Sequence, residues 1–291
     1  MSIWEHLNQQ ISQATGRPFQ ARDNQGVGGG CINQTTRISD GQRSYFVKIN
    51  HIAHGDMFQA EAEGLAEMAA GKTLRVPEPI VYGDYQQQCY LVLEYLQLDG
   101  RIDSRMFGEQ FAAMHRITQP RFGWHRNNTI GSTPQVNDWC EDWVEFWRQH
   151  RLGYQLQLAQ SNGCGNRLLN LGEQLMSRMS VLFDDYHPQP SMLHGDLWTG
   201  NAAALKNGTP VIFDPAFYYG DREADLAMTE LFGSFGRDFY AAYNAAWPID
   251  AGYNVRRTFY NLYHIINHFN MFGGGYLGQA ESMAERVLAE I

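Results

Sequence analysis

The residues best suited to catalysis lie in one short stretch near residue 200 and at one acidic position after it. Residues 194–201 read HGDLWTGN, and Asp214 follows thirteen residues after Asn201. In phosphoryl transfer, one carboxylate orients the attacking hydroxyl and accepts its proton, while an amide oxygen and a second carboxylate hold magnesium on the nucleotide phosphates. Asp196, Asn201 and Asp214 fit these three roles in that order.

The spacing of these residues is that of the protein-kinase catalytic loop, in which Asn follows Asp by five residues and the metal-binding Asp ends the next hairpin. Here a Gly replaces the Arg of His-Arg-Asp, and Pro215 and Ala216 replace the Phe and Gly of Asp-Phe-Gly. The missing Arg and Phe argue against a protein kinase that is regulated through an activation loop. The pattern favours a small-molecule kinase of the same fold. The alternative, in which Asp196 caps a turn and Asp214 a strand end, leaves the matched spacings to chance.

A lysine flanked by apolar residues in the first third of the chain is the candidate for the cation that this chemistry needs. Lys48 lies in the apolar run FVKI, where it is placed to neutralise the α- and β-phosphates of a nucleotide. A charged residue in such a strand usually has a buried partner. Glu61 is the predicted partner because it shares a helical face with Phe58 and Leu65, and Glu63 is its competitor. A surface lysine is the alternative.

Three consecutive glycines, Gly28, Gly29 and Gly30, are candidates for a phosphate-binding loop, since missing side chains let backbone N–H groups approach phosphate oxygens. An ordinary turn is the alternative. The stretch fails the Rossmann fingerprint because Cys31 takes the position of the last glycine and no helix follows. A thiol among such N–H groups is expected to have a lowered pKa, so Cys31 is a candidate redox switch, or else a small residue that fits the loop.

A third candidate segment for nucleotide binding is the run LVLEYL at 91–96, which resembles the hinge of kinase-like folds. Backbone groups of Glu94, Tyr95 and Leu96 are expected to hydrogen-bond an adenine there. An ordinary core strand explains the apolar residues equally well.

The elements that must position these residues change in type along the chain. An opening helix over Ile3 to Ile11 ends at Gly16, and strands are predicted at 32–38, 44–49, 80–82 and 89–96, with a helix at 56–70. Asp40-Gly41 between two strand-like runs is a strong hairpin signal.

After Gly100 the apolar residues recur at helical spacing. Helices are predicted at 104–117, 137–160, 166–184, 222–232 and 255–271. The exception is 192–214, where two short strands joined by Asn207-Gly208 end at Asp214.

These patterns predict an α+β, bilobal, protein-kinase-like fold. Residues 1–96 form a nucleotide-binding lobe with a small antiparallel sheet and one key helix. Residues 97–291 form a larger, mostly helical lobe for catalysis and acceptor binding, with the hairpin of 192–214 in its middle.

The composition limits the classes of binding partner that are expected and indicates a cellular compartment. With 22 basic and 31 acidic residues the 291-residue chain has a formal net charge of −9, which disfavours nucleic acid and anionic membrane surfaces as partners. No apolar run reaches the roughly 20 residues that span a bilayer. The four cysteines show no zinc-like spacing, which is typical of a reducing compartment. A cytoplasmic protein, monomeric or weakly homodimeric, is expected.

Beyond these roles, five stretches of the chain resemble the fructosamine-3-kinase (ketosamine-3-kinase) family, a branch of the kinase-like fold beside aminoglycoside phosphotransferases and choline kinases. They are GGGCIN at 28–33, Met57-Phe58 with Glu61, HGDLWTGN at 194–201, Asp214-Pro215-Ala216 and GDREADLAM at 220–228. The resemblance covers nearly the whole chain.

The resemblance implies ATP- and Mg²⁺-dependent phosphorylation of a ketosamine, free or protein-bound, at its third-carbon hydroxyl. Ribulosamines and fructosamines are the implied sugars. The phosphate ester then eliminates and frees the amine, which amounts to deglycation. Two other functions stay open, a kinase of another acceptor such as choline or an aminoglycoside, and a non-catalytic nucleotide-binding module.

The resemblance assigns Asp196 as the base, Asn201 and Asp214 as magnesium ligands, and Lys48 with Glu61 as the phosphate-positioning pair. The three glycines of 28–30 become the phosphate loop. These assignments agree with the roles inferred from the residues themselves.

Further residues around the catalytic stretch have a chemical and a packing interpretation. Trp198 either stacks on the sugar or packs as a core aromatic. Asp225 is expected to anchor the catalytic loop through backbone N–H groups, with His194 as structural support. His264 and Asn267 share one face of a late helix and either line the acceptor pocket, bind a metal or pack.

Overall fold

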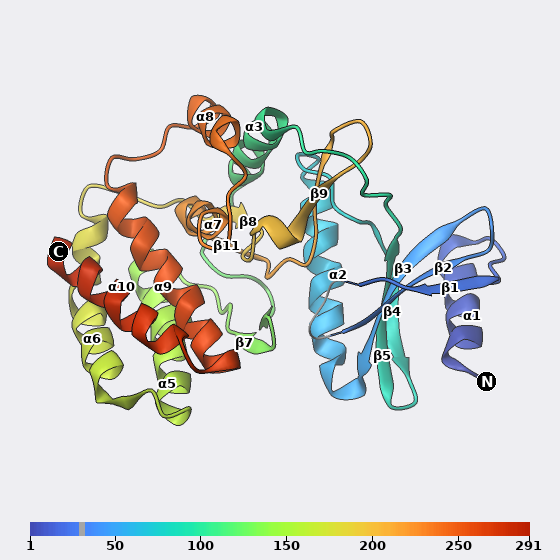
Figure 1. Cartoon of the computed structure of the whole chain (residues 1–291), viewed down its shortest axis with the longest axis horizontal. Helices are drawn as coiled ribbons and strands as arrows, with labels where there is room; N and C mark the ends of the chain where they lie inside the picture. Colours follow the sequence, from blue (N-terminus) through green and yellow to red (C-terminus); the bar gives the residue numbers. More distant parts are fainter. Residues whose placement is uncertain (29–32) are drawn as a thin grey trace. The chain divides into compact units, whose positions relative to one another are not determined.

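The computed structural model describes residues 1–28 and 33–291, and the structural statements below refer to these residues (Figure 1). They form two compact units. The first comprises Met1–Ile102 and Ala203–Asp214, and the second Asp103–Ala202 and Pro215–Ile291. Residues 203–214, expected in the second lobe, therefore group with the first unit. The boundary expected between residues 96 and 97 stays a prediction about domains.

The first unit is built on a five-stranded sheet with the order β1-β2-β3-β5-β4, in which all neighbouring strands are antiparallel. The strands are β1 (Asp23–Gly26), β2 (Gln34–Ser39), β3 (Ser44–His51), β4 (Pro79–Tyr85) and β5 (Gln88–Glu94). The predicted hairpin between β2 and β3 is confirmed, with Asp40 Oδ1 accepting the N–H groups of Gln42 and Arg43, and Gly41 at φ +93°. Polar, exposed β1 carries no apolar signal and was not predicted.

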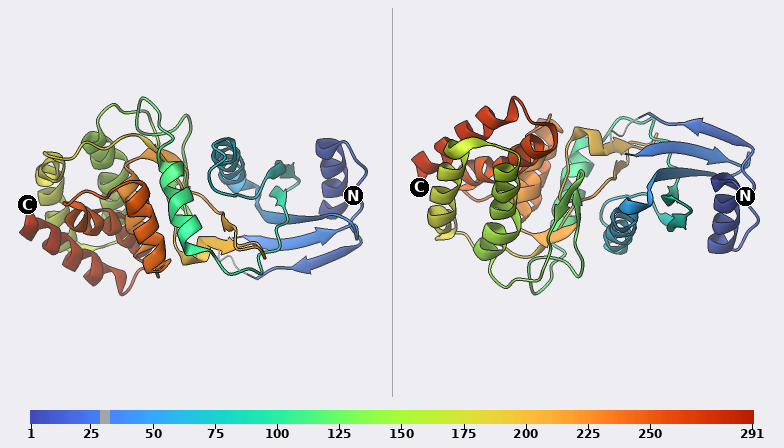
Figure 2. Two further views of the ribbon diagram at one scale, coloured as in Figure 1. Left: turned by 90° about the horizontal axis from the view of Figure 1, so that it is seen from above. Right: turned by 90° about the horizontal axis from the view of Figure 1, so that it is seen from below.

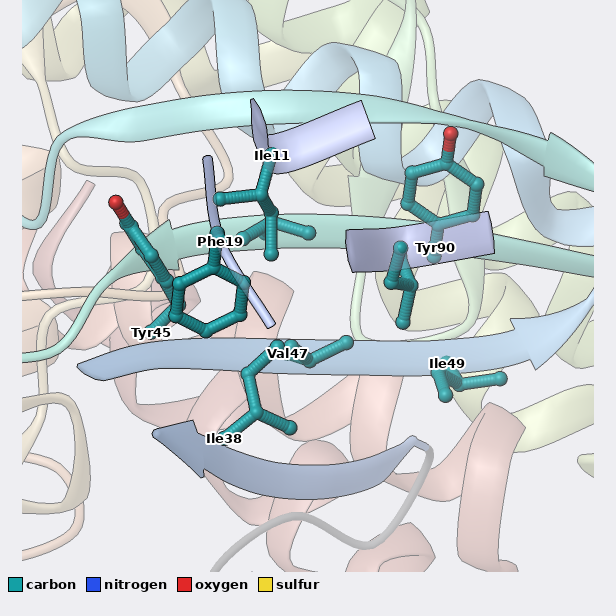
Figure 3. Packing of buried hydrophobic residues seen from close by; sticks show 9 residues of the cluster. Ile11, Phe19, Ile38, Tyr45, Val47, Ile49 and Tyr90 are labelled. Carbon is teal, nitrogen blue, oxygen red and sulfur yellow. The ribbon is translucent and has the colours of Figure 1, made fainter. Parts of the chain in front are cut away.

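Two helices cover opposite faces of this sheet (Figure 1), α1 (Ile3–Thr15) and α2 (Gly55–Ala70). Side chains alternate along a strand, so Val47 and Ile49 of β3 face α1 while Lys48 between them faces α2. A capping box of Ser2 and Glu5 begins α1. The core between α1 and the sheet (Figure 3) contains Leu7, Ile11, Phe19, Ile38, Tyr45, Val47, Ile49, Tyr90 and Val92.

The short hairpin of β9 (Ala202–Ala204) and β10 (Pro210–Ile212) carries Asp214 into the first unit. Its turn is the predicted one, with Gly208 at φ +87°. Val211 forms a parallel bridge with Arg75, whose carbonyl accepts the N–H of Ile212 at 3.0 Å. A side chain on Gly100 would meet the Leu205 carbonyl at 1.8 Å, so a glycine is needed at this close approach. These contacts explain why the hairpin packs with residues far before it in the sequence.

The second unit is mostly helical. Its α-helices are α3 (Ser104–His115), α4 (Trp143–Trp147), α5 (Tyr154–Ser161), α6 (Gly165–Arg178), α7 (Arg222–Thr229), α8 (Arg237–Ala246), α9 (Tyr253–Phe272) and α10 (Tyr276–Glu290). Short helical turns are η2 (Arg148–Gly153) and η3 (Met179–Phe183), with η4 (Thr199–Asn201) in the catalytic stretch and η1 (Ile52–His54) in the first unit. Among the described residues, no helix is both long and apolar enough to cross a membrane.

The prediction of one helix over 137–160 is confirmed from Trp143 onward and wrong for residues 137–142. Helix α4 begins only at Trp143, and the next turn, Arg148–Gly153, is π-helical before α5 continues. Cys140 instead pairs with Phe122 as an isolated antiparallel bridge, and residues 137–142 are not helical. Helices α8 and α10 were not predicted. Helix α8 lies side by side with α3 (Figures 1 and 2), where Gly108 permits close contact with the Phe239 carbonyl.

Two small antiparallel pairs complete the second unit. Strand β8 (Ser191–Leu193) leads into the catalytic stretch and pairs with β11 (Tyr218–Gly220). The hairpin of β6 (Asn128–Ile130) and β7 (Thr133–Gln135) precedes α4 and was not predicted. Helix α9 is buried along much of its length and packs against α7 and α10.

Candidate active site

In the first unit, Lys48 joins two carboxylates. Its Nζ donates to Glu61 Oε1 and to Asp214 Oδ1, each at 2.6 Å. The expected ion pair with Glu61 is therefore present. The competitor Glu63 accepts a hydrogen bond from Gln59 instead, one turn earlier on the same helix. Strand alternation on β3 and the inward face of α2 bring Lys48 and Glu61 together.

The side chains of Lys48, Glu61 and Asp214 interact mainly through their charges. Burial lowers the pKa of Lys48, but the carboxylates of Asp214 and Glu61 more than offset it, so the pKa is raised and the amine stays cationic. The Lys48 and Glu61 side chains are 5% and 10% exposed, whereas that of Asp214 is 43% exposed. Asp214 also has φ +59°, a conformation that non-glycine residues adopt rarely and that recurs at functional sites.

In the second unit, the turn of residues 194–196 after β8, which is the predicted catalytic turn, is fixed through its backbone N–H groups. Asp225 of α7 accepts the N–H of His194 at 2.6 Å and that of Gly195 at 2.7 Å. His194 Nδ1 accepts the Asp196 N–H at 3.2 Å. Gly195 has φ +81°, and a Cβ there would lie 2.1 Å from the Ala216 carbonyl oxygen. A glycine is therefore required before Asp196, and Asp225 makes the two bonds expected of an anchor.

Asp196 and Asn201 lie together at the end of this turn. Asn201 Nδ2 donates to the Asp196 carbonyl at 2.9 Å and to Asp196 Oδ2 at 3.3 Å. The short helical turn η4, which ends at Asn201, folds the amide back toward Asp196. The amide nitrogen is thus occupied, and the amide oxygen is the atom suited to a metal ligand.

A model of the fructosamine kinase family matches residues 3–290. The chain belongs to this family. It is 49% identical to a protein named probable ketoamine kinase from Synechocystis, over 98% of this chain and 97% of that protein. It is 43% identical to the chloroplastic protein-ribulosamine 3-kinase of Arabidopsis thaliana, over 90% of this chain and 81% of that protein.

Solved structures agree with the family assignment. A candidate fructosamine-3-kinase from Haemophilus somnus has a TM-score of 0.90 at 28% identity, with 99% of this chain and 100% of that chain covered. An aminoglycoside phosphotransferase has a TM-score of 0.64 at 13% identity, with 99% and 97% covered, which shows a shared fold. The predicted family, the kinase-like α+β fold and the predicted phosphotransferase class are confirmed.

Trp198 of this family member is a surface residue and not a core aromatic. Its side chain is 37% exposed and meets Phe232 edge to face with ring centroids 6.4 Å apart. A Cβ on Gly200 would lie 2.3 Å from the indole, so the ring rests directly on that glycine. Thr199 Oγ1 donates to the Phe232 carbonyl at 3.1 Å, which ties Phe232 to the catalytic stretch. This exposure favours the stacking role over the packing role.

His264 and Asn267 of α9 are buried, at 4% and 1% exposure. Burial lowers the pKa of His264 to about 3, so its ring is neutral at physiological pH. Asn267 uses both ends of its amide within the protein, accepting from Gln155 and donating to the Ile130 carbonyl. Across the described residues, no three His, Cys, Asp or Glu side chains are grouped to hold a metal. Packing is therefore the role that the geometry of these two residues favours.

The nucleotide candidates of the first unit are described only in part. Gly28 is exposed and follows Val27, whose N–H donates to the Thr35 carbonyl on β2. Gly29, Gly30 and Cys31 lie outside the described residues.

Strand β5 ends at Glu94, the first residue of the predicted adenine contact. Its N–H donates to the Glu78 carbonyl and its carboxylate pairs with Arg75, so a contribution to adenine binding would come from its carbonyl. The Tyr95 ring is covered by the Arg37 guanidinium at 5.0 Å, and Leu96 follows beyond the strand.

Several polar residues near the catalytic turn were not predicted. Asp221 caps α7 and accepts the hydroxyls of Tyr260 at 2.5 Å and Tyr186 at 2.7 Å. Gln135 and Arg151 are 1% and 0% exposed. Asp221 lies in the run GDREADLAM, which the sequence analysis singled out. No periodicity or motif marks Gln135 or Arg151.

Proposed function

We propose that this chain is an ATP-dependent ketosamine 3-kinase that phosphorylates the third-carbon hydroxyl of ribulosamines or fructosamines. The observation that carries this proposal is the hydrogen-bonded pair of Asp196 and Asn201 on a turn anchored by Asp225. Membership of the fructosamine kinase family and likeness to a protein-ribulosamine 3-kinase support the acceptor class. Free and protein-bound ketosamines are both proposed substrates.

In the proposed mechanism Asp196 orients the sugar hydroxyl and accepts its proton as the γ-phosphoryl group is transferred. Lys48, held cationic by Glu61 and Asp214, binds the α- and β-phosphates. The glycines at 28–30 are proposed to contact the phosphates through backbone N–H groups. The backbone of 94–96 is proposed to hold the adenine.

The donor set fits Mg²⁺, which prefers oxygen ligands. Asn201 donates its amide N–H to Asp196, which leaves the amide oxygen for a metal. Asp214 accepts the hydrogen bond of Lys48 with one carboxylate oxygen, and its side chain stays 43% exposed. Asn201 and Asp214 are therefore the residues proposed to hold the ion. When bound, the ion neutralises charge on the transferred phosphate. Trp198 is proposed to stack on the sugar.

The phosphate ester of the product is expected to eliminate and free the amine, so the net effect is deglycation of amino acids or proteins. Nucleic acid and membranes are not proposed as partners. A cytoplasmic location and a monomer or weak homodimer stay predictions.

The test is ADP release with Mg²⁺ and ATP over a panel of ribuloselysine, fructoselysine, choline and kanamycin. Asp196→Asn, which should lose about 10²- to 10⁴-fold in kcat, is the control. Turnover of a ketosamine by the unmutated protein, but not by Asp196→Asn, supports the proposal. Turnover of choline or kanamycin alone would move the function to a sister family, and silence across the panel would favour a nucleotide-binding module.

A further inference from the structure

The backbone that follows Pro215 is held by two side-chain amides from the β6–β7 hairpin. Gln135 Nε2 donates to the Ala216 carbonyl at 3.1 Å, and Asn128 Nδ2 donates to the Phe217 carbonyl at 2.8 Å. Two consecutive carbonyl groups therefore find their partners in side chains and not in a neighbouring strand. Buried carbonyls rarely lack a partner, so these two amides supply what the local backbone does not.

The two amides are themselves fixed. Gln135 is 1% exposed, and its Nε2 also donates to Asn128 Oδ1 at 2.9 Å. The Tyr263 hydroxyl donates to Gln135 Oε1 at 2.9 Å. Both ends of the Gln135 amide are thus engaged, which leaves the side chain one orientation. A satisfied polar network in a low-dielectric interior is rigid and specifies a single arrangement.

A second set of hydrogen bonds holds the Asn128 side chain in place. Asn137 Nδ2 donates to Asn128 Oδ1 at 2.8 Å, and Arg151 Nη2 donates to Asn137 Oδ1 at 2.8 Å. Arg151 is fully buried, and its Nη1 donates to the Val136 carbonyl at 2.6 Å. The guanidinium lies over the Tyr218 ring at 4.1 Å, so it also packs on the strand that follows Phe217. Hairpin, π-helical turn and β11 form one connected network.

This network ends at the catalytic turn. The Ala216 carbonyl oxygen lies 2.1 Å from the position that a Cβ on Gly195 would take, so it packs directly on that glycine. Asp225 holds the N–H of Gly195 at 2.7 Å. The residue before Asp196 is therefore enclosed between a fixed carboxylate and a fixed carbonyl. A displaced Ala216 carbonyl would press on the turn or open a gap beside it.

We propose that Gln135 is a positioning residue for phosphoryl transfer: its amide fixes the Ala216 carbonyl against Gly195 and so sets the place of Asp196, with Asn128 holding the next carbonyl. The inference rests on the proposed function, in which Asp196 is the base. It adds an element, the β6–β7 hairpin, to the catalytic apparatus. Gln135 touches no reacting atom and acts only through the turn.

The experiment uses the full chain with the acceptor that it turns over best. Gln135→Met keeps the size of the side chain and removes both hydrogen-bonding ends. A small displacement of a catalytic group is costly, so kcat should fall about 10- to 100-fold. The KM for ATP and the binding of a fluorescent ATP analogue should stay within about twofold. Ser132→Ala, in the exposed turn of the same hairpin, is the matched control.

A double-mutant cycle separates positioning from mere stability. In the Asp196→Asn background, Gln135→Met should cost less than threefold more, because the group that it positions is already gone. Equal losses in both backgrounds would overturn the proposal, as would unchanged kcat in folded Gln135→Met.

If Gln135→Met does not fold, Gln135→Glu, which keeps an acceptor for Tyr263, takes its place. Unfolding of both variants would also overturn the proposal. Full activity of Asp196→Asn would instead reject the proposed function itself.

Discussion

Lys48 Nζ lies 2.6 Å from Asp214 Oδ1, although 166 residues separate the two in the sequence. The contact exists because the β9–β10 hairpin packs with the first unit and delivers Asp214 in a positive-φ conformation. The proposed phosphate-binding cation and one proposed metal ligand are therefore in direct contact within one unit. We therefore expect a substitution that removes the charge of one residue to change the electrostatic environment of the other.

Replacing the buried cation tests this relationship. Lys48→Met leaves the carboxylates of Glu61 and Asp214 facing each other without compensation. Removing one partner of a buried ion pair costs about 3–5 kcal/mol, and the half-exposed Asp214 places the expected loss of unfolding free energy near the lower figure. Urea denaturation measures it, and kinetics should show a raised KM for ATP and a kcat reduced about 100-fold or more.

The control for this substitution is Lys72→Met, at an exposed lysine of the same unit. It should leave both measurements nearly unchanged. Unaltered ATP kinetics in Lys48→Met would remove Lys48 from the nucleotide site. Combining Lys48→Met with Glu61→Gln should recover part of the lost stability, because one uncompensated buried charge is then neutral.

The local parts of the site were predictable from the sequence because they depend on spacing within one element or turn. Asp196 and Asn201 are five residues apart on one turn, and their hydrogen bonds follow from that spacing. The pair of Lys48 and Glu61 follows from alternation on a strand and from the inward face of a helix. The inference on Lys48 and Glu61 needed only periods of two and of 3.6 residues, and the inference on Asp196 and Asn201 needed only the five-residue spacing of the kinase catalytic loop.

The non-local parts were not predictable because nothing in the chain marks their partners. The Arg75–Val211 bridge assigns the β9–β10 hairpin to the first unit, and neither residue belongs to a motif. The prediction carried the apolar spacing after Trp143 back over 137–142, where Cys140 instead forms a β-bridge with Phe122. Gln135 is an ordinary polar residue in sequence, and only the fold buries it against the Ala216 carbonyl.

The anchor of the catalytic turn gives a second prediction. Both carboxylate oxygens of Asp225 accept backbone N–H groups, so Asp225→Asn replaces one acceptor with an NH₂ group that faces another donor. An unsatisfied buried donor costs about 1–3 kcal/mol. We expect kcat to fall about 100-fold through the displaced turn. Asp238→Asn, at an exposed position of α8, should change neither unfolding nor kcat. Wild-type kcat in Asp225→Asn would show that the turn holds its shape without the anchor.

Buried His264 predicts an acid-sensitive fold. Its pKa is about 3 when folded, against an ordinary value of 6.5, so the unfolded chain binds the proton first as the pH falls. The stability that depends on a neutral ring is present above pH 6.5 and is lost as the pH falls toward 3. Between pH 7 and pH 5 the loss from this one group is about 2 kcal/mol.

The measurement is the urea unfolding free energy of the wild type and His264→Gln at pH 7 and pH 5. The other titrating groups contribute almost equally to both proteins, so the difference isolates His264. The variant is less stable at pH 7 because it disturbs packing, but its loss on acidification should be about 2 kcal/mol smaller. An equal loss in both proteins would mean that His264 is protonated in the fold at pH 5.

The contact between Trp198 and Gly200 provides a test of substrate binding that leaves every polar group in place. In Gly200→Ala the new methyl group would lie 2.3 Å from the indole, so the ring must leave its position. If Trp198 stacks on the sugar, the KM for the ketosamine should rise about tenfold, the loss expected for one stacking contact, while the KM for ATP stays the same.

Gly278→Ala on α10, where a methyl group meets no neighbour within 4 Å, is the matched control and should alter neither constant. Trp198→Ala should reproduce the acceptor effect of Gly200→Ala, and the double variant should add little to either, because both changes remove the same stacking surface. A rise in the KM for ATP in Gly200→Ala, or none for the ketosamine in Trp198→Ala, would exclude the ring from the acceptor site.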